Sequence, residues 1–270
     1  MTTATATVAP GTQDPPALLR ANTGGVLRLT LNRPLQFNAL SEEMLASLRA
    51  ELDAAAGDAG VRVVVLAAAG KAFCAGHDLR QIQDNPRLDY YQWLFAECAR
   101  MVGQIRNLPQ PVIARVQGLA TAGGCQLVAA CDLAVAADTA RFAASGINIG
   151  LFCATPAVPL SRNMGQKQAF EMLVTGEFID AATARERGLV NRVVAADALD
   201  AEVDVLARAI LSKPAGIVAA GKALFYRQQE MGTAAAYQLA VQSMANNVMD
   251  PVAQEGISAF LGKRAPLWLS

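Results

Sequence analysis

The first stretch of the chain with a clear capacity for chemistry is AGGCQ, at residues 122–126. Its two consecutive glycines follow an apolar run at 111–116, which predicts a buried strand, and they begin a predicted helix. The first turn of a helix leaves backbone N–H groups without intrahelical acceptors, and such donors can stabilise a developing negative charge. The turn is therefore a candidate half of an oxyanion hole. Glycine pairs also occur where a helix only needs to pack closely on a strand.

A second stretch, KAFCAGHDL at residues 71–79, contains His77, which is the only histidine. A histidine invites a general-base role because its ordinary pKa lies near neutrality. The five cysteines lie in apolar segments without CxxC pairs, which indicates reduced, buried thiols in an intracellular protein. No cluster of His, Cys and carboxylate residues has metal-ligand spacing, so we expect neither a metal nor a redox cofactor.

Composition narrows the classes of partner. The chain has 270 residues, of which 53% are hydrophobic and 17% charged, and this is ample for one large core. Lys and Arg together number 23, as do Asp and Glu, so the neutral balance predicts no nucleic-acid or membrane partner. A mean hydropathy of +0.27 suggests that apolar surface is buried between subunits.

Two segments bear on membranes and location. The uncharged run at 142–161 is long enough to span a bilayer, but its prolines, glycines and polar residues indicate a buried loop and a short helix. Residues 1–22 are expected to be a disordered leader, because they lack the basic and apolar regions of a secretory signal. Arginine is absent before Arg20, which weakens a mitochondrial presequence, so the sequence predicts a cytoplasmic protein.

Hydrophobic periodicity alternates between strands and helices in residues 23–198. Strands are predicted at 26–31, 61–66, 111–116, 133–137 and 189–194, helices at 41–56, 89–107, 157–164, 166–175 and 181–187, and an irregular segment at 142–151. Residues 199–270 show only helical patterns, at 199–212, 215–230, 233–248 and 251–261. An α/β core followed by an all-helical region is therefore predicted. The doubly wound dinucleotide-binding class is disfavoured because no GxGxxG follows the strand at 26–31.

Five motifs in order resemble the crotonase (enoyl-CoA hydratase/isomerase) superfamily, over residues 24–268. They are LNRPLQFNALS, KAFCAGHDL, GLATAGGCQLVAACDLAVAAD, LVTGEFIDAATARERGLVNRVV and EGISAFLGKRAPLW. Within that superfamily, GHDL at 76–79 and INIGLF at 147–152 are similar to the GHDL and VNVGLF stretches of a branch of animal enoyl-CoA-hydratase-domain-containing proteins. The resemblance implies a spiral of ββα turns in the core at 23–198. It also implies a homotrimer or dimer of trimers formed through the C-terminal helices at 199–270.

The resemblance also implies an acyl-CoA thioester ligand whose carbonyl oxygen is held by two backbone N–H groups. By position, these belong to His77 and Gly123. Asp78, Leu79, Arg80, Gln126 and Lys263 are the implied substrate-binding residues, with Arg80 and Lys263 near the nucleotide of CoA. Both cations could equally be solvated surface residues.

The sequence departs from the family pattern at the two positions that supply the acid and the base for hydration. Hydratases carry one glutamate directly after the GGC turn and another about twenty residues later, and here those positions hold Gln126 and Gly146. An amide cannot relay a proton, and glycine has no side chain, so hydratase activity is doubtful. Glu97, Cys153 and Glu171 are the remaining candidates for a relocated acid or base, besides Asp78.

Two hypotheses remain open. The chain is an enzyme working through a thioester enolate or oxyanion, such as a lyase, isomerase or hydrolase, or it is a non-catalytic acyl-CoA-binding homologue. We predict that the double change Gln126→Glu, Gly146→Glu gains measurable hydration of crotonyl-CoA, whereas the wild type and each single change show little.

Overall fold

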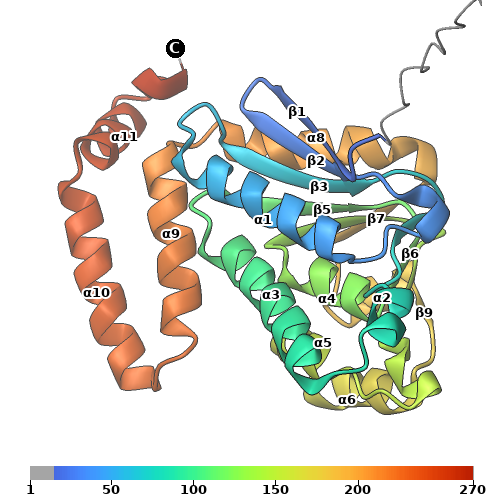
Figure 1. The fold of residues 1–270 in the computed structure, drawn as a ribbon. Coiled ribbons are helices and arrows are strands. Elements are labelled where there is room, and N and C mark those ends of the chain that lie inside the picture. The colour runs from blue at the N-terminus through green and yellow to red at the C-terminus, as the bar shows by residue number, and fades with distance from the viewer. Residues whose placement is uncertain (1–14, 270) are drawn as a thin grey trace, which may run out of the picture.

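The computed structural model describes residues 15–269, which form a mixed α/β core followed by helices (Figure 1). A six-stranded sheet has the order β1-β2-β3-β5-β7-β10, and a four-stranded sheet has the order β4-β6-β8-β9. The large sheet contains β1 (Leu18–Thr23), β2 (Val26–Leu31), β3 (Val63–Ala68), β5 (Val112–Val116), β7 (Leu133–Ala137) and β10 (Arg192–Val194). The small sheet contains β4 (Ala72–Cys74), β6 (Leu119–Thr121), β8 (Arg141–Ala143) and β9 (Ile179–Asp180).

The two sheets are built by one repeating path. Each repeat places a strand in the large sheet, a second strand in the small sheet after a short turn, and then a helix: β3-β4, β5-β6 and β7-β8 are three such pairs. Within the large sheet only β1 and β2 pair antiparallel. Within the small sheet β4, β6 and β8 are parallel, so their carboxyl ends lie at one edge. The crotonase-like ββα spiral expected from the sequence is thus present.

Helices cover both faces of the large sheet. The helices are α1 (Glu42–Gly57), α2 (Leu79–Asp84), α3 (Leu88–Asn107), α4 (Gly123–Ala130), α5 (Ala154–Asn163), α6 (Gln166–Thr175), α7 (Ala181–Glu186), α8 (Leu199–Leu211), α9 (Ala215–Gln228), α10 (Thr233–Met249) and α11 (Pro251–Leu261). The main apolar core joins α1, α3 and α4 to one face of the strands. Val203 and Ala207 of α8 pack with Val65 and Ile113 on the opposite face.

The C-terminal helices stand beside the core (Figure 1). Although the helical region begins at 199 as predicted, α8 is packed against the large sheet, and α9 is the first helix to lie apart from it. Among the described elements, α10 makes substantial contact only with its neighbours α9 and α11. In residues 15–269 no helix combines the length and hydropathy needed to cross a bilayer.

The expectation of a disordered leader over 1–22 is wrong for its last residues. Residues 1–14 lie outside the described part of the chain, but β1 begins at Leu18 and pairs with β2 through a turn at Gly24 and Gly25. The sequence did not reveal this strand because five of its six side chains are exposed at the sheet edge, so no apolar alternation marks it. The segment at 142–151, expected to be irregular, contributes part of β8.

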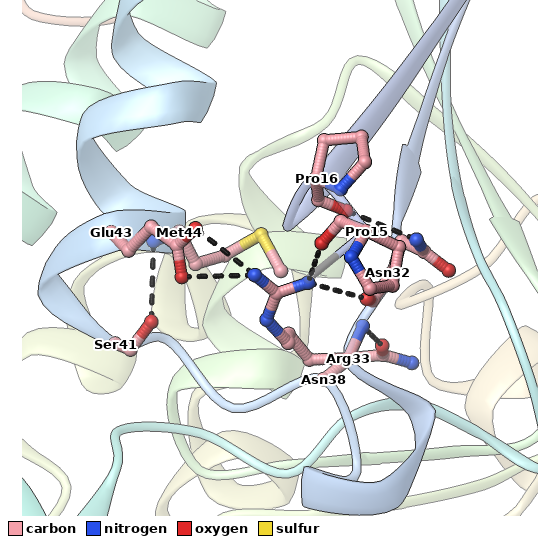
Figure 2. Close-up of polar contacts among 8 residues, drawn as sticks. All are labelled: Pro15, Pro16, Asn32, Arg33, Asn38, Ser41, Glu43 and Met44. Atoms are coloured by element: carbon pink, nitrogen blue, oxygen red, sulfur yellow. Dashed lines mark hydrogen bonds and ion pairs between the residues drawn. The ribbon is translucent and has the colours of Figure 1, made fainter. Parts of the chain in front are cut away.

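A polar cluster fixes the loop between β2 and α1 (Figure 2). The Arg33 guanidinium donates to the Pro15 carbonyl at 2.6 Å and to both carboxylate oxygens of Glu43. The Asn38 side chain is fully buried, accepts from the Arg33 N–H at 2.9 Å, and donates to the carbonyls of Ala69 and Ala72 at 2.8 Å. These bonds hold Phe37 and Asn38 at positive φ values of 52° and 54°, and so position the loop that forms one wall of the site.

Candidate active site

The site lies where three parallel strands of the small sheet end side by side. Strand β6 lies between β4 and β8, with Cys74 opposite Ala120 and Thr121 opposite Ala143. His77 follows β4, Gly123 follows β6, and the segment beginning at Ser145 follows β8. Neighbouring strands are about 5 Å apart, so these three segments reach the same edge of the sheet.

The turn after β6 is held in a conformation that non-glycine residues rarely adopt. Ala122 has φ 48° and ψ −118°, and its N–H donates to the Ala143 carbonyl at 2.9 Å. Such strain persists only where the surroundings impose it, and it is concentrated at functional sites. A Cβ on Gly124 would lie 2.0 Å from the Cys74 carbonyl oxygen, so the glycine permits helix α4 to start directly against β4. The glycines therefore serve both close packing and the aim of the helix N-terminus.

Two backbone donors meet at this turn. A Cβ on Gly76 would lie 3.1 Å from the Gly123 nitrogen, which shows how closely the peptide before His77 approaches the helix start. Neither the His77 N–H nor the Gly123 N–H donates to another group in residues 15–269. Both residues line one cavity of about 650 Å³. Unpaired donors at a helix N-terminus, facing a cavity, can bind a carbonyl oxygen that gains negative charge.

The walls of the cavity are mainly apolar. Phe37 and Leu35 come from the loop after β2, Phe95 from α3, and Ile149 and Phe152 from the segment before α5. Such a lining suits an acyl chain, with few polar groups to fix its orientation.

The His77 imidazole is placed poorly for proton transfer. Its ring packs edge-on against Phe95 with centroids 5.2 Å apart, and neither ring nitrogen has a hydrogen-bond partner in the described part of the chain. Burial lowers the pKa of His77 to about 4, and the nearby Leu40 carbonyl opposes this shift only in part. The imidazole is therefore neutral and only weakly basic at physiological pH.

The three residues after His77 also line the cavity, at the start of α2. The Asp78 carboxylate caps this helix by accepting from the N–H groups of Arg80 at 2.9 Å and Gln81 at 3.3 Å. This structural role occupies the carboxylate. Leu79 adds apolar surface, and Arg80 presents an exposed cation at the cavity rim.

At the two positions where hydratases carry glutamates, this chain offers no acid. Gln126 is 2% exposed, and its side-chain oxygen accepts from the Thr155 hydroxyl at 3.2 Å. Gly146 lines the cavity, but a Cβ there would lie 2.5 Å from the Leu151 carbonyl oxygen and 2.8 Å from Cys153 Sγ. The double change to glutamate expected to restore hydration is therefore sterically blocked at position 146.

Of the other candidate acids and bases, Cys153 lines the cavity, whereas Glu97 and Glu171 do not. Glu97 pairs with Arg100 and Arg49, whose hydrogen bonds lower its pKa, and Glu171 pairs with Arg187 at 2.9 Å. Neither glutamate lines the cavity, so neither is placed as its acid or base. The structure does bring Cys153 into the cavity wall. Lys263 follows α11 and does not line the cavity.

Sequence reasoning missed a second set of polar residues. The hydroxyls of Thr121 and Ser145 are hydrogen-bonded across β6 and β8, and Ser145 and Thr155 both line the cavity. Phe95 was also missed. Hydroxyl residues are too common for spacing to mark them, and only the register of two three-residue strands brings Thr121 to Ser145. Across residues 15–269 no group of three or more His, Cys, Asp or Glu side chains is arranged to hold a metal ion.

Known proteins resemble this chain over most of its length. The family model described as enoyl-CoA hydratase/isomerase matches residues 21–270. The mouse enoyl-CoA hydratase domain-containing protein 3, mitochondrial, is 45% identical over 90% of this chain and 81% of its own length. A crystal structure of enoyl-CoA hydratase from Mycobacterium smegmatis is 59% identical, with a TM-score of 0.93, and covers 95% of this chain and 100% of its own. The human enoyl coenzyme A hydratase domain-containing protein 3 is 42% identical, with a TM-score of 0.91, over 93% and 100% of the two chains.

These relatives correct one expectation from the sequence. The mouse, rat, frog and human relatives are named as mitochondrial, which contradicts the predicted cytoplasmic location. The predicted location rested on the composition of the first residues, which was taken to exclude a targeting segment. Residues 1–14 lie outside the described part of the chain. Together, the family model, the identities and the shared fold show that this chain belongs to the enoyl-CoA hydratase/isomerase family of the crotonase superfamily.

Proposed function

We propose that this protein binds an acyl-CoA thioester and polarises its carbonyl between the backbone N–H groups of His77 and Gly123. The observation that carries the proposal is the pair of unpaired donors that meet at a strained turn beside an apolar cavity. A carbonyl oxygen held by two fixed donors gains negative charge at low cost, because the donors need not reorganise during the reaction. The acyl chain lies in the apolar part of the cavity.

The nucleotide end of CoA carries phosphates, which need cationic partners. Arg80 is at the cavity rim and is the cation of this chain that can contact them. Lys263 does not line this cavity, and its contact with the nucleotide end of CoA is proposed from the family resemblance alone. No metal or redox group enters this proposal.

The chemistry best supported is one that needs an enolate or oxyanion but no pair of carboxylates. Isomerisation, carbon–carbon or carbon–heteroatom lysis, and thioester hydrolysis all fit this description. The second candidate is an acyl-CoA-binding protein without a reaction, and it is favoured by the neutral Gln126–Thr155 contact and by the absence of a side chain at Gly146. The strained backbone at Ala122 favours the enzyme, because a strained turn that positions N–H donors for a carbonyl oxygen has little use without a reaction.

Calorimetry tests the binding mode directly. Butyryl-CoA should bind, and its thioether analogue, S-butyl-CoA, should bind about five- to 150-fold more weakly. This range is what two net hydrogen bonds of about 0.5–1.5 kcal/mol each are worth. Equal affinity for the two compounds would mean that the donors do not hold the carbonyl. A parallel panel of enoyl-, hydroxyacyl- and malonyl-type thioesters, followed for substrate loss, separates the enzyme from the binding protein.

A further inference from the structure

Cys153 has a placement that the proposed function does not use. It is 6% exposed, lines the cavity, and occupies the residue immediately before the first turn of α5. Its sulfur also lies close to the Gly146 backbone, whose N–H acts to lower the pKa of the thiol and so favours the thiolate. A helix N-terminus and a backbone donor are both features that support thiol reactivity.

The sulfur fills the space that a side chain at position 146 would need. A Cβ on Gly146 would lie 2.8 Å from Cys153 Sγ, and the Leu151 N–H donates to the Gly146 carbonyl at 3.0 Å, which folds this segment back on itself. Beyond β8, therefore, the cavity wall presents a thiol. The other four cysteines are buried away from the cavity lining.

The opposite part of the same wall presents the two N–H groups proposed to donate to the carbonyl oxygen. Gly123 lies two residues past Thr121, and Ser145 lies two residues past Ala143, the strand partner of Thr121. The thiol and the donors thus come from adjacent strand ends and line one cavity.

These positions have a chemical consequence for an unsaturated ligand. In an α,β-unsaturated thioester the β-carbon is electrophilic, and it becomes more so when the carbonyl oxygen accepts hydrogen bonds. The β-carbon is two bonds from the carbonyl carbon, so a ligand held by His77 and Gly123 directs it along the wall towards position 146. We propose, on the basis of the function proposed above, that Cys153 adds to the β-carbon of α,β-unsaturated acyl-CoA thioesters and forms a covalent, reversible adduct.

The addition is balanced without another reactant. The bond between Sγ and the β-carbon forms as the carbon–carbon π bond breaks, and its electron pair moves to the thioester oxygen as an enolate held by the two N–H groups. The proton lost by the thiol ends on the α-carbon. The product is a thioether that still carries the whole CoA moiety. Saturated acyl-CoA cannot react in this way.

The rate of this step is limited by the thiol. Burial raises the pKa of Cys153, and the Gly146 N–H opposes that shift only in part. Because the thiolate is the reactive form, the addition is slow near neutrality and accelerates as the pH rises. One oxyanion donor is worth about a hundred- to a thousandfold in rate, so Cys153 should react at least about a hundredfold faster than the other cysteines.

Intact-mass spectrometry of the full chain with crotonyl-CoA tests the inference. We expect one adduct of the mass of whole crotonyl-CoA, located by peptide mapping at Cys153, and no adduct with butyryl-CoA. The Cys153→Ser variant should lose the adduct, whereas the matched Cys98→Ala variant, which removes a buried thiol of α3, should keep it. If Cys153→Ser does not fold, the peptide map of the wild-type protein decides the position.

Three outcomes would overturn the inference. They are no adduct, adducts spread evenly over the five cysteines, or a gain of the acyl mass alone, which would mean attack at the carbonyl. Calorimetry with butyryl-CoA in the same samples separates this failure from that of the proposed function. Butyryl-CoA binding without a crotonyl-CoA adduct contradicts only the role of Cys153, whereas loss of both contradicts both proposals.

Discussion

At residue 124 the backbone of one strand leaves no room for a side chain. A Cβ there would lie 2.0 Å from the Cys74 carbonyl oxygen and 2.6 Å from its carbonyl carbon. Backbone atoms of a buried, hydrogen-bonded strand cannot move aside as a flexible side chain can, so Gly124→Ala should destabilise the protein by at least about 2 kcal/mol and displace the Gly123 N–H. Denaturant unfolding measures the first effect, and acyl-CoA affinity the second.

Gly103→Ala is the matched control for that change. Gly103 lies inside α3, and a Cβ there would meet nothing within 4 Å. The same substitution should therefore stabilise the protein, by about 0.5–1 kcal/mol, because alanine favours a helix interior. Equal effects of the two substitutions would contradict the packing argument at position 124.

His77 is predicted to stay neutral across the physiological range. The folded state binds its proton with a pKa of about 4, below the ordinary value of 6.5, because the ring is buried. Between these values the unfolded chain binds more protons, so the free energy of unfolding rises with pH from about 4 to 6.5 and is lost as the pH falls. His77→Ala should flatten this part of the stability profile.

Proton NMR gives an independent check, because the chain has one histidine. Its ring signals should not titrate between pH 5 and 8. A midpoint near 6.5 would mean that the imidazole is solvated.

The glycine turns of the candidate site can be located from the sequence, whereas the contacts of most of its side chains cannot. AGHDL and AGGCQ could be recognised because glycine and a helix start leave a local signature, and the structure brings both segments to one cavity. Glu97 could not be assigned from the sequence, because only the packing of α1 on α3 shows that it faces Arg49 and not the cavity. The fit of Cys153 against Gly146 likewise depends on a long-range fold.

At the scale of elements, the attachment of α9 depends on a buried ion pair. Lys222 Nζ contacts Asp132 Oδ2 at 2.6 Å and donates to the Ile105 carbonyl at 2.8 Å, and the Tyr226 hydroxyl donates to Asp132 Oδ1 at 2.7 Å. The Lys222 and Asp132 side chains are 7% and 12% exposed. Removing one partner leaves the other charge buried, so Lys222→Met should lower the free energy of unfolding by about 3–5 kcal/mol.

Arg20→Gln provides the control for this prediction. It breaks an ion pair with Glu51 whose side chains are 42% and 30% exposed, and should cost less than about 1 kcal/mol. Hydrogen exchange should show faster exchange in α9 for Lys222→Met alone. An unchanged α9 would mean that this pair does not anchor the helix.

Long helices were predicted from the sequence more accurately than short strands. The long helices α1 and α3 were predicted to within about a residue or two, because several turns of apolar periodicity mark them. Strands β4, β6 and β8 have three residues each, which is too short for any alternation to appear. The small sheet that carries the site was therefore implied only by family resemblance.

At the scale of the whole molecule, the C-terminal helices expose an apolar stripe. Four apolar residues recur at helical spacing along α10 and are 41–71% exposed: Tyr237, Val241, Met244 and Val248. Exposed apolar stripes of this kind are typical of subunit interfaces. We expect light scattering to give three or six times the chain mass of 28.3 kDa at micromolar concentration.

Substitutions on α10 test which surface forms that assembly. The Val241→Glu, Met244→Glu variant should shift towards the monomer, whereas Gln242→Glu, a neighbouring exposed position, should not. A wild-type monomer would contradict the predicted assembly.

The central claim is that a thioester carbonyl lies between the His77 and Gly123 N–H groups. Infrared difference spectroscopy of bound butyryl-CoA, with carbon-13 at the carbonyl to assign the band, tests it most directly. Two hydrogen bonds in a water-excluded site draw electron density onto the oxygen and weaken the carbon–oxygen double bond. The carbonyl stretch should lie at lower frequency in the complex than in water. A band that stays at its frequency in water, or moves higher, would show that the carbonyl is not held between these donors.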